Sequence, residues 1–155
     1  MRKLTTIAML SVGVLALAMV GDGFAAKAKR TREAVTLTPD ELKWKDVPDS
    51  GGITVAEVWG SMAKGAHGAF AKFPPGHENP LHTHSADIKV VVVSGTFTYG
   101  PEGGAVKRFG PGSYVMIPGG LKHTSGCDPG SPCLLFQEQP ARFDLKPAAP
   151  PPRGR

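Results

Sequence analysis

The sequence predicts an all-β protein, and two observations lead to this class. Of the 155 residues, 41% are apolar, which is enough for a packed core, while 20 Gly and 15 Pro are typical of many turns between short strands. Several short segments also alternate apolar and polar residues and are rich in β-branched side chains, as strands with one buried face are. The length fits one domain once the two ends are set aside.

The first 25 residues follow the plan of a secretory signal peptide. A basic start, Met1 to Lys3, precedes an apolar run from Leu4 to Val20, and small-residue cleavage sites follow Ala25 and Ala28. The run is short for a bilayer span and contains Gly13, so cleavage is expected rather than anchoring. The mature protein is therefore expected to be periplasmic or secreted, with no membrane attachment.

A basic leader, 26–37, precedes the expected domain, 38–145, and a Pro-rich tail, 146–155, is expected to be disordered. Nine of the 18 basic residues lie outside 33–145. Residues 33–145 hold the other nine basic residues and twelve acidic residues, which gives this segment a net charge of −3. The total of +5 thus arises from the ends. A nucleic-acid partner is not expected.

Inside the domain, the residue pattern predicts one helical turn and then a series of strands. Trp59 is expected in the core and His67 in a loop. The helical turn is expected at 38–42, the strands at 53–60, 68–73, 82–94, 114–123 and 133–139, and a hairpin at 95–104.

Two of these segments carry histidines in a pattern that suits a metal ion. Side chains alternate faces along a strand, so His82 and His84 point to one side and can converge on one cation. His123 comes from the second segment. Three imidazoles bind a divalent transition metal and leave a position for water or substrate. The alternative is that these histidines are hydrogen-bonded pocket residues without a metal.

The histidine segments resemble the two motifs of the cupin superfamily. Gly76, five residues, His82-x-His84 and a strand ending at Gly95 match most of the first motif. The second is matched by Gly112, Pro118-Gly119-Gly120 and His123. The chain is thus similar to small single-domain cupins over about 53–140. The resemblance implies a cupin-type double-stranded β-helix, an antiparallel jelly-roll barrel, with a metal site inside.

One residue of the cupin pattern is missing here. The glutamate of the first motif should stand at Ile88 or, with one extra residue, at Lys89. Asp87 is the nearest acid, but on a regular strand it faces away from the histidines, and only a bulge turns it inward. Three histidines are therefore expected, with Asp87 as the alternative fourth ligand. An acid farther out is then expected to orient an imidazole N–H. The candidates for that role or for the pocket wall are Glu57, Glu78, Asp87, Glu138 and Gln137.

Cys127 and Cys133 bracket a turn-forming loop, 128–132. In an exported protein such a pair most often forms a disulfide. Cys127 also stands where the second cupin motif has an asparagine. The alternative is therefore that Cys127 reaches the metal or acts as a redox thiol.

The resemblance leaves the function open between classes. One hypothesis is an exported metal-dependent enzyme for a small molecule, because three histidines resemble the ligand set of cupin dioxygenases that act on thiols or diketones. Hydrolase or isomerase chemistry is also compatible. The other hypothesis is a non-catalytic module that binds or senses a small molecule or metal. A homodimer is compatible with either, and the sequence does not distinguish Fe, Zn, Mn, Ni or Cu.

Overall fold

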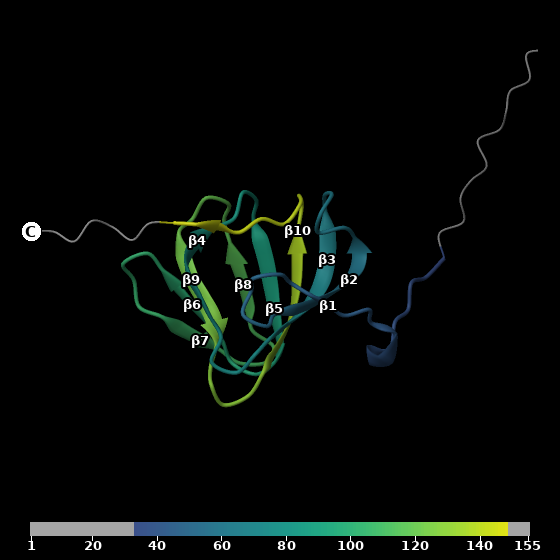
Figure 1. Ribbon diagram of the computed structural model, residues 1–155, viewed down its shortest axis with the longest axis horizontal. Helices are drawn as coiled ribbons and strands as arrows, with labels where there is room; N and C mark the ends of the chain where they lie inside the picture. The colour runs from purple at the N-terminus through teal and green to yellow at the C-terminus, as the bar shows by residue number, and fades with distance from the viewer. Residues whose placement is uncertain (1–32, 149–155) are drawn as a thin grey trace, which may run out of the picture. The chain divides into compact units, whose positions relative to one another are not determined.

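The computed structural model describes residues 33–148 and has the predicted all-β fold (Figure 1). Residues 35–148 lie in one compact unit. Apart from the short 3-10 helix η1 (Pro39–Glu41), the regular elements of the described chain are strands in two antiparallel sheets. The expected signal peptide and its cleavage sites lie outside the described residues, as does 149–155.

The two sheets interleave strands from distant parts of the chain, as a jelly roll does. The six-stranded sheet has the order β1-β2-β3-β10-β5-β8, and the five-stranded sheet has the order β11-β4-β9-β6-β7. The strands are β1 (Lys45–Asp46), β2 (Thr54–Gly60), β3 (His67–Phe73), β4 (Glu78–Thr83), β5 (Ile88–Ser94), β6 (Phe97–Pro101), β7 (Lys107–Phe109), β8 (Tyr114–Ile117), β9 (His123–Cys127), β10 (Cys133–Gln139) and β11 (Lys146–Pro147).

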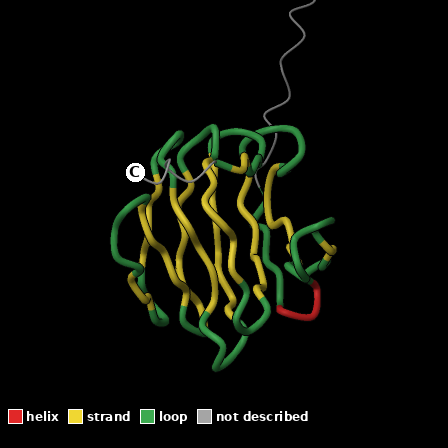
Figure 2. Tube along the Cα trace, turned by 60° about the vertical axis from the view of Figure 1, so that its left-hand side comes forward, coloured by secondary structure: helices red, strands yellow, loops and turns green. Residues whose placement is uncertain are grey.

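The core lies between the inner faces of the two sheets. Figure 2 shows the strands running side by side, with loops at both ends and the short helix η1 at one side. In β5, Ile88, Val90 and Val92 are buried while the alternate residues are more exposed, which is the period-two pattern of a strand with one covered face. Strand β10 follows the same alternation, with Leu135 in the core. The predicted hairpin is present as β6 paired with β7.

The strand expected over 114–123 is in fact two strands. β8 ends at Ile117, a turn follows, and His123 begins β9 in the other sheet. The reason is the turn sequence Pro118-Gly119-Gly120, whose last residue has a φ of +78°, a backbone conformation that glycine adopts without strain. His123 is thereby moved to the sheet that carries His82.

Two expectations about single residues were wrong. The pairing of β2 with β3 shifts register between Glu57 and Trp59, so Trp59 pairs with Gly68 and is 44% exposed rather than in the core. His67 is the first residue of β3 and fully buried, with Nδ1 hydrogen-bonded to the Gly65 carbonyl, rather than a loop residue.

The start of the expected disordered tail is also different in the structure. Lys146 and Pro147 form β11, which pairs with Thr83 and His82 at the edge of the five-stranded sheet. Pro147 lacks an N–H, and an edge strand is the position in a sheet that accepts proline. Within 33–148 there is no helix long and apolar enough to span a membrane.

Candidate metal centre

The three predicted histidines meet inside the barrel. His82 lies in β4, His84 follows the end of that strand, and His123 stands directly opposite His82 in the ladder between β4 and β9. One ring nitrogen from each residue lies within 4.8 Å of the other two. The residues are 1%, 5% and 1% exposed, so the cluster is in the interior.

Backbone carbonyls hold all three rings in one tautomer. The Nδ1–H of His82 donates to the Pro80 carbonyl at 2.7 Å, that of His123 to the Leu121 carbonyl at 2.9 Å, and that of His84 to the Asp144 carbonyl. Because Nδ1 carries the proton in each ring, Nε2 is the bare nitrogen. Three unprotonated, converging Nε2 atoms are the donor set that a divalent transition metal needs, so the residues fit such an ion.

The expectation that an acid orients an imidazole is therefore wrong for these rings. Asp87 accepts a hydrogen bond from the Gly119 N–H at 2.9 Å and is outside the histidine cluster. Glu57 accepts from the Met62 N–H, and Glu138 lies opposite Lys89 on the outer face of the six-stranded sheet. Of the four acids, Glu78 alone lines the cavity, and it is exposed.

The chain leaves the strand after His84, and Ile88 stands at the position where the cupin motif has its glutamate. Residues 84–87 form a bend, and β5 starts at Ile88, whose side chain lines the cavity beside the histidines. The Gly119 turn packs on this bend so closely that a Cβ at 119 would lie 2.7 Å from the Ser85 carbonyl oxygen. Together with the bond from the Gly120 N–H to the His84 carbonyl, this contact holds the two histidine segments together.

Burial keeps the cluster neutral. Desolvation lowers the pKa of His82 to about 4, with smaller lowering effects from His123 and His84. Desolvation also lowers the pKa values of His84 and His123. Imidazoles with lowered pKa values are unprotonated at neutral pH, which is the form that binds a metal.

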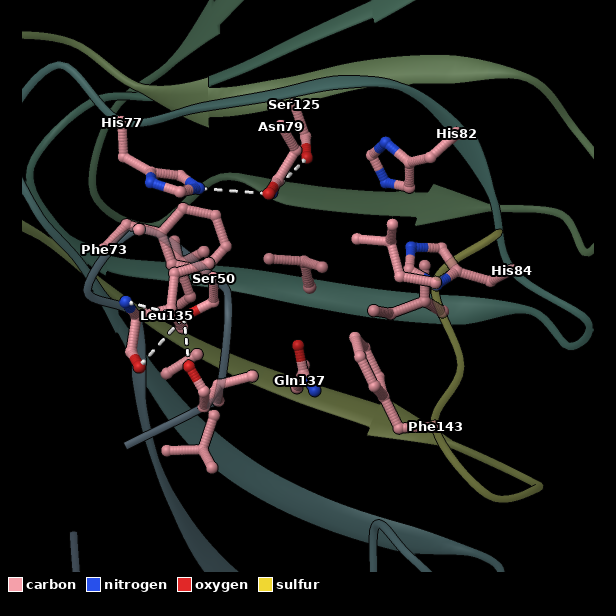
Figure 3. Close-up of a pocket in the computed structure, with 18 of the residues that line it drawn as sticks. Ser50, Phe73, His77, Asn79, His82, His84, Ser125, Leu135, Gln137 and Phe143 are labelled. Atoms are coloured by element: carbon pink, nitrogen blue, oxygen red, sulfur yellow. Dashed lines mark hydrogen bonds between the residues drawn. The ribbon is translucent and has the colours of Figure 1, made fainter. Parts of the chain in front are cut away.

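The histidines open onto a cavity of about 700 Å³. Its wall is largely apolar, with Phe73 and Leu135 at one end of the view and Phe143 beside His84 (Figure 3). The rings of His84 and Phe143 have centroids 5.4 Å apart. Gln137, one of the predicted pocket residues, also lines this cavity and is buried. A cavity of this kind accepts an apolar molecule with a few polar groups.

Cys127 and Cys133 are joined in a disulfide between the end of β9 and the start of β10. Neither cysteine is free to act as a thiol or a metal ligand in this state. The bond connects the strand that begins with His123 to a strand of the other sheet.

A second polar group in the cavity was missed by the sequence analysis. His77 Nε2 is 3.0 Å from Asn79 Oδ1, and Asn79 Nδ2 donates to Ser125 Oγ at 3.1 Å. All three line the cavity (Figure 3). Ser125 could have been found, because it is two residues beyond His123 on one strand. Asn79 could not, because a register shift between it and His82 sets its direction.

Comparisons with known proteins agree with this architecture. Among solved structures, the polyketide cyclase RemF from Streptomyces resistomycificus is 19% identical with a TM-score of 0.64, over 76% of this chain and 87% of that one. KdgF from Halomonas sp. is 24% identical with a TM-score of 0.54, over 68% and 94%. The DMSP lyase DddQ from Ruegeria pomeroyi DSS-3 is 19% identical with a TM-score of 0.55, over 74% and 64%. These likenesses show the fold.

The family is shown by the sequence itself. No curated protein matches the chain. The model of the ChrR cupin-like domain, however, matches residues 32–141, which include both histidine segments and most of the barrel. The match spans more than half of the chain and contains every residue of the histidine cluster. The resemblance to cupins stated from the motifs is therefore confirmed, and the protein belongs to the ChrR cupin-like family.

Proposed function

We propose that this protein binds a divalent transition metal through Nε2 of His82, His84 and His123 and acts as a metal-dependent enzyme on a small molecule. Two observations carry the proposal together: one ring nitrogen of each histidine lies within 4.8 Å of the other two, and the hydrogen bonds of the three Nδ1–H groups leave Nε2 bare in every ring. A bound divalent metal supplies Lewis acidity and an open position for substrate or water. Fe, Zn, Mn, Ni and Cu all accept imidazole ligands.

The residues around the cluster favour one kind of substrate. Neutral imidazoles leave the charge of a divalent ion uncompensated, so an oxygen or sulfur atom that becomes anionic on binding is favoured as a further ligand. Among the residues that the structure describes, no Lys or Arg lines the cavity, and the two carboxylates in its wall, Asp49 and Glu78, are exposed. The rest of the wall is mainly apolar. A largely apolar molecule with an enol, phenol or thiol group fits these walls.

Metal analysis tests the site directly. His84→Ala is expected to reduce bound metal after loading with Zn²⁺ or Fe²⁺ to less than a tenth of the wild-type stoichiometry. Asp87→Asn is the matched control: it removes the charge of the nearest acid but keeps the acceptor for the Gly119 N–H. It is expected to retain full stoichiometry. Full metal content in His84→Ala would refute the three-histidine site, and loss in Asp87→Asn would establish Asp87 as a ligand.

Oxygen uptake separates an oxygenase from a binding module. We expect the iron-loaded protein to consume oxygen with at least one member of a panel of thiols, diketones and phenolics, and the iron-free protein not to. One observation favours a non-catalytic binding or sensing module instead: apart from the histidines, no buried acid or base lines the described cavity. Saturable binding of a panel member without turnover would support that second function.

Export and dimer formation complete the proposal. The signal-peptide pattern and the Cys127–Cys133 disulfide support a periplasmic or secreted protein, because disulfides persist in oxidising compartments. N-terminal sequencing of the protein from its own cells should find Ala26 or Lys29 first, and an intact Met1 would refute cleavage.

The outer face of the six-stranded sheet supports a homodimer. A row of apolar side chains crosses four strands there: Phe70, Phe136, Val91 and Tyr114. Val91 and Tyr114 are 39% and 58% exposed. Lys72 and Glu138 flank this row on opposite sides, because β3 and β10 are antiparallel. A two-fold axis along the row would place Glu138 of one copy near Lys72 of the other, which makes the face self-complementary.

A further inference from the structure

His77, Asn79 and Ser125 form a chain of hydrogen bonds at the side of the cavity, and the Ser125 O–H is the one donor in it without an acceptor among the described residues. An amide oxygen accepts only, so the 3.0 Å contact requires His77 Nε2 to carry the proton that it donates to Asn79 Oδ1. Asn79 then donates through Nδ2 to Ser125 Oγ at 3.1 Å. Ser125 is the acceptor in this bond, so its own O–H is free to donate. No residue within 33–148 accepts a hydrogen bond from it.

The position of Ser125 places this donor at the wall of the cavity. Ser125 lies two residues after His123 on β9, on the same inward face, and two residues along a strand span about 7 Å. It is 9% exposed and lines the cavity. In Figure 3, Asn79 and Ser125 lie between His77 and His82. The cavity therefore has a hydrogen-bond donor about 7 Å along the strand from His123, one of the proposed metal ligands.

We propose that Ser125, oriented by Asn79 and His77, forms a subsite that donates a hydrogen bond to a neutral carbonyl oxygen of the ligand. The inference rests on the proposed function, since the ligand's other oxygen binds the metal. A neutral acceptor is favoured over a carboxylate because no Lys or Arg among residues 33–148 lines the cavity. The ligand class is thus an apolar molecule that carries an ionisable hydroxyl and a carbonyl about 7 Å apart, the spacing of two residues along a strand.

Two phenols that differ at one group test the subsite. 4-Hydroxyacetophenone carries the carbonyl, and 4-ethylphenol lacks it but has a similar shape. Calorimetric titration of the Zn²⁺-loaded wild type is expected to give a lower Kd for the ketone, both because Ser125 donates to its carbonyl and because the acetyl group makes the phenol more acidic. Ser125→Ala should reduce the ratio of the two Kd values about five- to tenfold, as the loss of one hydrogen bond does, and Ser125→Thr should retain it. Thr124→Ala, which removes a hydroxyl that donates to the Gly100 carbonyl, is the matched control and should also retain it.

The outcomes separate this inference from the proposed function. Equal affinity for the two phenols in the wild type, failure of both to bind the zinc-loaded protein, or an unchanged ketone preference in Ser125→Ala would each overturn the subsite. Each of these results would leave the metal site standing, provided that metal analysis finds zinc bound. Absence of bound zinc in the wild type would refute the proposed function and this inference with it.

Discussion

Lowering the pH from 7 to 5 is expected to destabilise the metal-free protein by about 2 kcal/mol through His82 alone. Burial lowers the pKa of His82 from 6.5 to about 4, so in this range the unfolded chain binds a proton that the folded protein does not. The stabilisation is complete above pH 6.5 and is lost as the pH falls toward 4. Burial also lowers the pKa values of His84 and His123, which adds to the loss.

The two carboxylates with lowered pKa values contribute little to the change in the free energy of unfolding between pH 7 and 5. Hydrogen bonds from Ser85 lower the pKa of Asp144 from 3.8 to about 2, and hydrogen bonds from Thr38 lower the pKa of Glu41 from 4.5. A carboxylate with a lowered pKa stabilises the fold above its unfolded value and loses this effect only below it. Their contributions therefore change mainly below pH 4.5, which is outside the interval from pH 7 to 5 over which the histidine contribution is to be measured.

Urea unfolding followed by circular dichroism at pH 7, 6 and 5, with a chelator present, measures this loss. The His82→Gln variant removes one of the titrating groups, so its free energy of unfolding should fall by about 2 kcal/mol less than that of the wild type between pH 7 and 5. A wild-type free energy of unfolding that is constant over this interval would refute the reasoning. An equal fall in wild type and variant would show that other groups cause it.

Three further predictions concern stability and assembly. Replacing Cys127 and Cys133, which are six residues apart, by Ala should lower the free energy of unfolding by about 2 kcal/mol, measured with urea, because a short loop constraint is removed; an unchanged value would contradict this. Gln139→Met should raise it by about 1 kcal/mol, since the buried Gln139 amide has no partner among the described residues, whereas a fall would show that the amide is satisfied. Val91→Lys should convert a dimer to a monomer in sedimentation velocity and Val35→Lys should not, and a monomeric wild type would refute the dimer.

The sequence predicted the histidine cluster because its information is local. His82 and His84 are separated by one residue, and the glycine-rich turn before His123 has a fixed spacing, so the cupin pattern was enough to identify all three. The final strand was also predicted at its observed bounds, Cys133–Gln139. The strands around the histidines were predicted less well: the segments expected as single strands over 82–94 and 114–123 are each interrupted, after Thr83 and after Ile117.

What the sequence did not predict depends on contacts between distant segments or on register shifts. The partner of His84 is a backbone carbonyl sixty residues away, and a carbonyl leaves no mark in side-chain chemistry. The shift before Trp59 moved that ring to the outer face, and the glycines around His67 suggested a loop where β3 begins. Acids were expected to accept hydrogen bonds from the imidazoles because acidic side chains are visible in a sequence. The acceptors are backbone carbonyls, and the direction of a carbonyl cannot be deduced from a sequence.

Residues 143–144, which follow both cupin motifs in the sequence, contact His84 of the histidine cluster. Phe143 packs against His84, the Asp144 carbonyl holds its ring, and the Asp144 carboxylate accepts hydrogen bonds from Ser85. The family match ends at residue 141, so a fragment trimmed to that boundary would keep every proposed ligand and still lose the clamp on one of them. Shortening the chain at this end to before Phe143 is therefore expected to free the ring of His84, one of the three proposed ligands.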